Sequence, residues 1–236
     1  MEQRIIESRR RQVIYDQKWK KLLSRSWVFR YLPFIEFVIA AGSMALGNVN
    51  RDSDFDVIVG VRLGRIFTAR FFLIVTLDIL GWRRRNLDHN ISSRDTICLN
   101  HFVTVSSYRL REPHNKYWQE LYRNLVPIFG KPEVVREFFK ANEDWLKWKI
   151  NYLDDLRHRY NSPSGFKFII ERALNGRLGN WLEGILRKPQ LKRIEEKLKP
   201  ALGYKPRLVY GDEELELHLD TKRTEEFAAD EILKTF

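Results

Sequence analysis

The sequence predicts a mixed α/β (α+β) fold, in which a small mixed sheet precedes a mainly helical region that ends in a β-hairpin. Two apolar segments of β character, 34–41 and 54–61, follow one another closely and are joined through a Gly-Ser turn. In the second half of the chain, apolar residues recur at the spacing of helices. The 236 residues, 44% of them hydrophobic, suffice for a buried core. We expect two regions, 1–110 around the sheet and 111–236 mainly helical.

The first half of the chain alternates between helical and strand patterns. A helix is expected first, because apolar residues such as Ile14 and Leu22 recur on one side, and Pro33 ends it. The second helix follows Gly64 and stops at Gly81. The strands are rich in β-branched and aromatic residues. In chain order we expect a helix at 3–30, a strand at 34–41, a helical turn at 43–47, a strand at 54–61, a helix at 65–80 and a strand at 96–105.

The second half has a helical pattern with one clear linker. Residues 161–165 contain proline, serine and glycine, and 127–132 interrupts the pattern earlier. Trp145, Trp148 and Tyr152 form an aromatic stripe among apolar neighbours, so we expect these rings to belong to the core. The expected elements are helices at 115–125, 133–160, 166–187 and 190–199, followed by a hairpin of 207–210 and 215–219.

Two aspartates open the second apolar strand. Residues i and i+2 of a strand point to the same face, so Asp54 and Asp56 are expected to hold two carboxylates side by side. Such a pair is costly to keep ionised unless a cation neutralises it, and hard oxygen ligands suit Mg²⁺ or Mn²⁺. Gly42 and Ser43 stand where the first strand turns into a short helix, a natural place for phosphate. Together, these residues predict a site for a metal-bound nucleoside triphosphate.

The order and spacing of these residues resemble a known signature. Gly42-Ser43, then Gly47, then Ser53-Asp54-Phe55-Asp56 is similar to the pattern of the nucleotidyltransferase superfamily typified by DNA polymerase beta, which includes the minimal nucleotidyltransferases. The resemblance covers residues 33–105. It implies metal-dependent transfer of a nucleoside monophosphate, AMP by default, from a triphosphate to a hydroxyl of an RNA or protein acceptor. By the same resemblance, Asp54 and Asp56 would ligate the metal, and Gly42 and Ser43 would hold the triphosphate.

The superfamily pattern implies a third acid on a later strand, and the corresponding segment, 96–105, has none. Asn100 or His101 stands at the expected position, and Asp95 and Asp88 precede the strand as alternatives. An amide can ligate Mg²⁺ but adds no charge, so Asn100 would complete the site with weaker binding of a second metal. The departure leaves two interpretations: an enzyme with atypical ligands, or a nucleotide- or RNA-binding module without efficient transfer.

The charge of a triphosphate would have to be met from outside the Gly-Ser turn. No basic residue directly follows Ser43, where many relatives carry one. Arg65 and Arg70, on the helix after the aspartate strand, are the expected nucleotide-binding residues, and Arg51 and Arg62 are further candidates. Each of these arginines has the simpler explanation of a solvated surface side chain.

The net charge of +11 is unevenly distributed along the chain. Residues 1–30 carry nine Lys/Arg against three Asp/Glu, whereas 201–236 carry five against nine. The excess of positive charge before residue 201 favours polyanionic partners such as RNA or nucleotide phosphates. The charge pattern therefore agrees with an RNA partner, although general solubility would explain it equally well.

Cysteine content and hydropathy bear on the compartment. The one cysteine, Cys98, is expected to be a buried apolar residue, and a chain without an internal disulfide fits a reducing cytoplasm. The most apolar stretch, 71–80, is shorter than the roughly 20 residues that span a bilayer, so stable membrane insertion is not expected. Peripheral membrane contact through the arginines at 83–85 is a third, weaker hypothesis.

Overall fold

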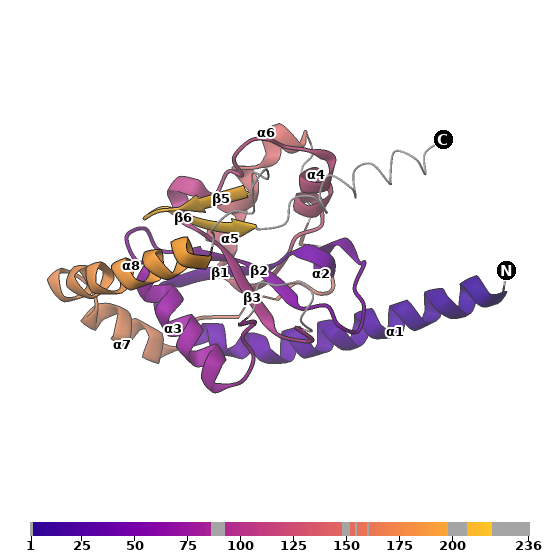
Figure 1. Cartoon of the computed structure of the whole chain (residues 1–236), viewed down its shortest axis with the longest axis horizontal. Coiled ribbons are helices and arrows are strands. Elements are labelled where there is room, and N and C mark those ends of the chain that lie inside the picture. Colours follow the sequence, from indigo (N-terminus) through magenta and orange to yellow (C-terminus); the bar gives the residue numbers. More distant parts are fainter. Residues whose placement is uncertain are drawn as a thin grey trace.

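The computed structural model describes residues 2–85, 93–147, 152, 153, 155–159, 161–197 and 207–218 (Figure 1). Its mixed α/β architecture confirms the predicted fold class. Helices pack on both faces of one sheet, and the strands of that sheet come from both halves of the chain.

Six strands of the described part form an open sheet in the order β4-β1-β2-β3-β6-β5. β2 and β3 run parallel, and the other neighbouring pairs are antiparallel. β4 and the β5–β6 hairpin lie beyond residue 110, so both flanks of the sheet come from the C-terminal region. The strands are β1 (Ile35–Ala40), β2 (Phe55–Val61), β3 (Ile97–Val103), β4 (Val126–Gly130), β5 (Arg207–Tyr210) and β6 (Glu214–His218).

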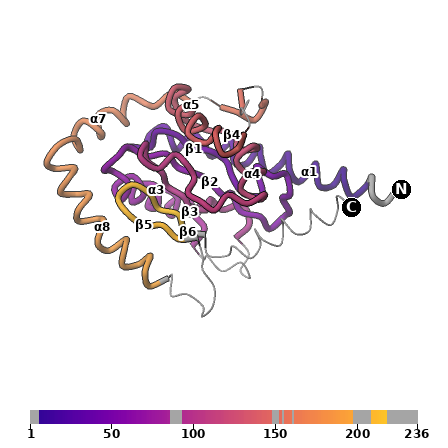
Figure 2. The backbone as a smooth tube through the Cα atoms, turned by 90° about the horizontal axis from the view of Figure 1, so that it is seen from above, coloured from indigo at the N-terminus to yellow at the C-terminus, as the bar shows by residue number. Residues whose placement is uncertain are grey.

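The helices differ widely in length and in how closely they follow the sheet. Figure 1 shows α1 running along the sheet and projecting past it at the N-terminal end, and Figure 2 shows α7 and α8 forming an arc around one side. The helices are α1 (Glu2–Arg25), η1 (Ser26–Arg30), α2 (Gly42–Leu46), α3 (Ile66–Ile79), η2 (Val105–Ser107), α4 (Lys116–Arg123), α5 (Pro132–Lys140), α6 (Glu143–Leu146), α7 (Gly165–Ala173) and α8 (Arg177–Lys197).

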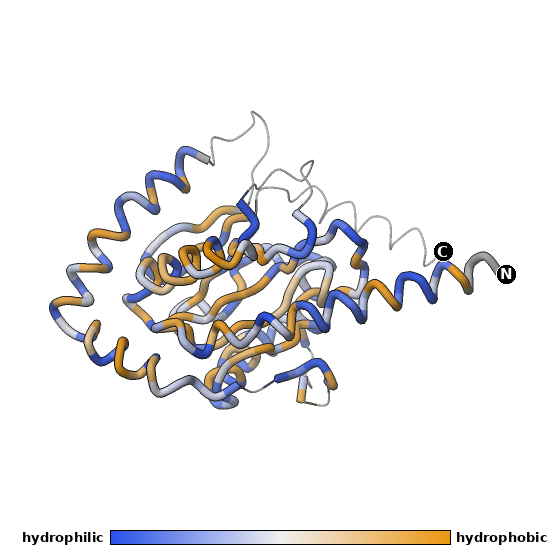
Figure 3. The backbone as a smooth tube through the Cα atoms, turned by 90° about the horizontal axis from the view of Figure 1, so that it is seen from below, coloured by the Kyte–Doolittle hydropathy of each residue, from blue (hydrophilic) through white to orange (hydrophobic). Residues whose placement is uncertain are grey.

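Two hydrophobic clusters cover the two faces of the sheet. Side chains of a strand alternate between faces, so Val57 and Val59 join the cluster that contains residues of α1, α3 and α8, whereas Ile58 joins the cluster of α4 and α5. Tyr152, from the predicted aromatic stripe, is buried in the second cluster, and Trp145 packs against it. Trp148 lies outside the described residues. In Figure 3 the hydrophobic residues follow the strands, while the turns of α8 alternate between hydrophobic and hydrophilic.

The helix predicted over 3–30 is divided into α1, which ends at Arg25, and the 3-10 helix η1. The other elements of the first half match the sequence predictions to within about two residues at each end, and the C-terminal hairpin is also confirmed. The second half differs in three places. First, the predicted break at 127–132 contains a strand, β4, at one edge of the sheet. Pro127 is compatible with this strand because an edge strand does not need every N–H for pairing.

The helix predicted over 133–160 is wrong in the described residues, where α5 ends at Lys140 and only the short α6 follows. The buried Asn142 explains the break. Its Oδ1 accepts hydrogen bonds from the Leu110 N–H and the Trp145 Nε1–H, and its Nδ2 donates to the Tyr108 carbonyl, with distances of 2.8–2.9 Å. Its Nδ2 also donates to the Phe138 carbonyl at 2.9 Å, the group that the N–H of Asn142 would bond in a continuing helix. The asparagine side chain thus takes over a backbone bond of the helix.

The remaining helices are also divided differently from the prediction. The helical conformation is interrupted at Gly176, which has a φ of 81°, rather than near Arg187 as predicted. α8 then continues through Pro189, where the sequence pattern predicted an interruption. The next residue, Gln190, fixes this part of α8 to α3, because its Nε2 donates to the Phe67 carbonyl at 2.8 Å.

Candidate functional site

Asp54 and Asp56 lie together at the start of β2. A carboxylate oxygen of each, together with the Sγ atom of Cys98, lies within 4.8 Å of the others. The parallel pairing of β2 with β3 sets Asp56 opposite Cys98, so the third side chain comes from the neighbouring strand. The structure thus brings the two predicted carboxylates to one place, and it adds a thiol that the sequence reading had assigned to the core alone.

The Gly-Ser turn lies directly against Asp56. The backbone N–H of Ala41 donates to the Asp56 carbonyl at 2.9 Å, and α2 begins at the next residue. Gly42 has a φ of 55°, and a Cβ atom at this position would lie 2.1 Å from Oδ2 of Asp56. Both the backbone conformation and the lack of space require glycine here. Ser43 follows as the second residue of α2.

Burial and a neighbouring like charge shift the pKa of Asp56. Desolvation, followed by the charge of Asp54, raises the pKa of Asp56 to about 7. Arg84 and hydrogen bonds involving Cys98 and Asn100 act in the opposite direction. A carboxyl group with this pKa is a place where an additional positive charge would be stabilised.

Arg84 is the cation that contacts this pair in the described residues. Its Nη1 lies 2.6 Å from Oδ2 of Asp54, and its side chain is only 6% exposed. The segment before it pairs with the start of β3, because the Ile97 N–H donates to the Trp82 carbonyl and the Arg84 N–H donates to the Ile97 carbonyl. The sequence reading placed Arg84 in a polar loop, since no local pattern reveals this pairing.

Asn100, one of the two residues expected at the position of the third acid, lies beside Asp56 together with Cys98. The Nδ2 of Asn100 donates to Oδ1 of Asp56 at 3.3 Å. Burial and the two aspartates raise the pKa of Cys98, which keeps its thiol protonated. Cys98 is buried, as predicted. The described part of β3 therefore surrounds Asp56 with neutral groups.

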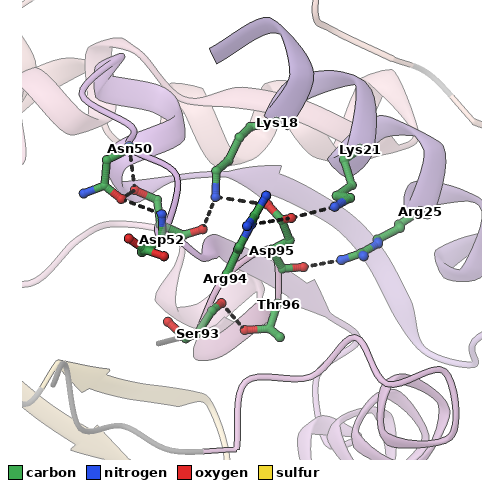
Figure 4. A network of polar contacts seen from close by, with 10 residues as sticks. Lys18, Lys21, Arg25, Asn50, Asp52, Ser93, Arg94, Asp95 and Thr96 are labelled. Atoms are coloured by element: carbon green, nitrogen blue, oxygen red, sulfur yellow. Dashed lines mark hydrogen bonds and ion pairs between the residues drawn. The ribbon is translucent and has the colours of Figure 1, made fainter. Parts of the chain in front are cut away.

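The alternatives for a third acid lie elsewhere. Asp95 has a φ of 60° and forms ion pairs with Lys18 at 3.0 Å and Lys21 at 2.5 Å (Figure 4). His101 faces the acids of β6: it is buried with Glu214 and Glu216, and the three groups have ligand atoms within 4.8 Å of one another. Asp88 lies outside the described residues.

Arg65 and Arg70 lie against α8 rather than beside the aspartates. Arg65 donates to Oδ1 of Asn180 at 2.8 Å, and Arg70 donates to Oε1 of Gln190 at 2.7 Å. Burial, followed by the charges of Arg83 and Arg193, lowers the pKa of Arg70 to about 10. Of the further candidates predicted for the triphosphate, Arg62 pairs with Glu171 of α7 and Arg51 is exposed.

Tyr117 of α4 is a neighbour of the site that the sequence reading did not identify. Burial and the nearby charge of Asp56 raise the pKa of Tyr117, so its phenol stays protonated. α4 belongs to the helical region after residue 110, and only the fold brings it to this face of the sheet. Tyrosine in an amphipathic helix carries no local signal of such a position.

Neither a protein-family model, nor a curated protein, nor a solved structure matches the chain. The resemblance to nucleotidyltransferases therefore rests on the motif residues and on the arrangement described above. Among the described helices, none combines the length and apolar character needed to cross a bilayer.

Proposed function

We propose that the protein is a cytoplasmic nucleotidyltransferase that moves a nucleoside monophosphate, with AMP the first candidate, from a triphosphate to an acceptor hydroxyl. The observation that carries the proposal is the contact between the Gly-Ser turn and the acid pair. A Cβ atom on Gly42 would lie 2.1 Å from Asp56, so a phosphate held by the turn would lie next to the carboxylates. This is the combination that a metal-bound triphosphate requires.

The donor set fits a divalent cation such as Mg²⁺ or Mn²⁺. Asp54 and Asp56 supply two hard oxygen ligands within 4.8 Å of each other. The raised pKa of Asp56, about 7, reflects burial first and the like charge of Asp54 second, and a bound cation would offset that like charge. When bound, the ion would supply a positive charge that polarises the triphosphate and favours ionisation of the acceptor hydroxyl.

The chain's own residues orient this chemistry. Asn100 and Cys98 hold Asp56 from the neighbouring strand, and the lack of a side chain at Gly42 leaves room for the Asp56 carboxylate against the turn. We assign the phosphate-binding cation to Arg84, because it already contacts Asp54, in place of Arg65 and Arg70. In the reaction, the acceptor oxygen bonds to the α-phosphorus, pyrophosphate leaves, and the hydroxyl proton is released.

The test is transfer of label from α-labelled nucleoside triphosphates to total RNA or to cell protein, with Mg²⁺ or Mn²⁺. We expect Asp54→Ala and Asp56→Ala to reduce transfer by about two orders of magnitude or more, because each removes a metal ligand. Asp52→Ala is the matched control, since Asp52 lies in the same loop with an exposed side chain. Equal transfer by all three variants would contradict the proposal.

A second candidate is a nucleotide-binding module with weak or no transfer. Two observations favour it: Arg84 already neutralises Asp54, and no acid of the described residues completes the pair from β3. Tight triphosphate binding without transfer to any acceptor would support this alternative. Asn100→Asp then becomes informative, because it places a third carboxylate beside Asp56 and should increase Mn²⁺ affinity by about tenfold. The matched control is Asn48→Asp, an exposed position in the loop before β2.

A further inference from the structure

A basic groove lies along α1, at the end of the sheet where β2 and β3 begin. The groove encloses about 930 Å³ and is bordered on one side by α1 and on the other by the loops that precede β2 and β3. Six cations line it: Arg9, Arg10, Lys18, Lys21, Arg51 and Arg94. Asp95 is the one acid among its described lining residues. The groove is therefore strongly positive, which favours a polyanion.

The lining residues of α1 recur at helical spacing. Ile6, Arg10, Val13, Gln17 and Lys21 all border the groove, and residues three or four apart lie on the same face of a helix. From residue 9 to residue 21 the helix rises by about 18 Å. This length matches roughly five nucleotides of a stacked strand at about 3.4 Å each.

Three of the cations have their charge available for a ligand. Arg9, Arg10 and Arg51 are exposed, and among the described residues none of them forms an ion pair. Lys18, Lys21 and Arg94 instead surround Asp95, at 3.0, 2.5 and 3.7 Å (Figure 4). One part of the groove is thus formed by the ion pairs around Asp95. The exposed arginines Arg9, Arg10 and Arg51 line the rest.

Lys18, one of the residues that line the groove, contacts the loop that precedes the acid pair. Lys18 donates to the Ser53 carbonyl at 2.5 Å, and the next residue in the chain is Asp54. Asp95 and Arg94 precede β3, the strand that carries Cys98 and Asn100. The groove and the acid pair therefore lie at the same end of the sheet but on opposite faces. A strand that leaves the groove would cross this end of the sheet to reach the site of transfer.

We infer that this groove binds the phosphate backbone of a single-stranded RNA, whose terminal hydroxyl is the acceptor of the reaction; the second clause rests on the proposed function. The cations face one another across a hollow, whereas a flat anionic bilayer would contact α1 alone. Ile6, Val13 and Ile14 lie within the same groove, where they offer apolar contacts to bases. RNA combines the repeated charge, the bases and the hydroxyl that these features require.

The inference is tested by RNA binding without nucleotide or metal, so its failure is separate from failure of the transfer reaction. The full chain is titrated against a labelled single-stranded 12-mer RNA, and anisotropy is followed at several salt concentrations. The groove variant combines Arg9→Glu, Arg10→Glu and Arg51→Glu. The control variant combines Lys131→Glu, Arg136→Glu and Lys140→Glu, exposed positions at α5 on the other face of the sheet. Both variants reverse three positive charges.

We expect the groove variant to bind RNA at least about tenfold more weakly and to lower the salt slope by about 2, because three phosphate contacts are lost. The control variant should bind like the unmodified chain. Equal weakening in both variants would overturn the inference, since general charge would then explain binding. Flotation with phosphatidylserine vesicles in the absence of RNA binding would also overturn it, as would tighter binding of a DNA strand of the same sequence. Thermal unfolding of both variants checks that they fold.

Discussion

At the scale of single residues, Asp56 combines a structural constraint with a functional one. Its main-chain carbonyl accepts the Ala41 N–H, while its carboxylate lies beside Asp54, Cys98 and Asn100. The position of the carboxylate is therefore set by β1 and β3 as much as by β2. Such a fixed position is expected of a metal ligand, because a divalent ion tolerates little displacement of its donors.

The raised pKa of Asp56 predicts a specific pH dependence. Between the ordinary carboxyl pKa of about 4 and the folded-state value of about 7, the folded protein binds a proton that the unfolded chain has lost. Stability of the metal-free protein should therefore fall as the pH rises through this range. Asp56→Asn removes the titrating group, so its free energy of unfolding should lack this fall. The difference in unfolding free energy between the two proteins should therefore change over the same pH range.

Binding of Mn²⁺ should show the opposite trend. The metal requires the ionised carboxylate, so the affinity should rise about tenfold per pH unit up to about pH 7 and level off above it. Calorimetric titrations from pH 5 to pH 8 check this, together with urea unfolding of the metal-free protein. A pH-independent affinity would show that Asp56 is not a ligand.

At the scale of elements, the N-terminus of α3 is capped by a side chain from α8. Glu183 accepts hydrogen bonds from the backbone N–H groups of Phe67 and Thr68, both at 2.8 Å, and from the Thr68 hydroxyl at 2.5 Å. The first N–H groups of a helix have no partner within the helix, and a carboxylate also interacts favourably with the helix dipole. The cap therefore joins two of the helices that cover one face of the sheet, α3 and α8.

Glu183→Gln should lower the free energy of unfolding by about 1–3 kcal/mol, because the amide loses the charge and turns one donor group toward the N–H groups. Urea unfolding monitored by circular dichroism measures the effect. Glu195→Gln is the control, since Glu195 is exposed on the same helix. If the two substitutions lower the free energy of unfolding equally, the cap does not stabilise α3.

Local patterns were sufficient for most elements of the first half, where Gly81 lies just beyond the end of α3, whereas α1 ends at Arg25, well before Pro33. They also identified Asp54, Asp56 and Gly42, because spacing along a strand and a turn is a local property. They could not identify β4, whose residues count as a strand only through pairing with β1. Arg84 was missed for the same reason, since its position depends on pairing with Ile97.

At the scale of the whole molecule, Asp95 connects α1 to the loops that carry the site (Figure 4). Lys18 and Lys21 contact its carboxylate, and Arg25 donates to its main-chain carbonyl. Burial alone would raise the pKa of Asp95, but the hydrogen bonds from Lys21 and Lys18 lower it below the ordinary value. The charge of Asp95 therefore stabilises the folded protein at neutral pH.

Asp95→Asn should cost about 1–3 kcal/mol of unfolding free energy at pH 7. Asparagine tolerates the left-handed backbone, so the substitution removes the charge without straining the turn. A carboxyl group with a lowered pKa loses its contribution as the pH falls, so the cost should shrink below about pH 4. Unfolding of both proteins at pH 7 and pH 3 checks the sign, with Asp52→Asn as the control. A cost that is the same at both pH values would exclude the ion pairs as its source.

The strand order has a consequence for how such a protein can diversify. The three strands of the first half are flanked by β4 on one side and by the β5–β6 hairpin on the other. Replacing the C-terminal half by an unrelated module would leave two open edges of apolar strands, which favour self-association. Sequence change is therefore more readily accommodated in surface loops and helix faces than by exchange of the C-terminal half.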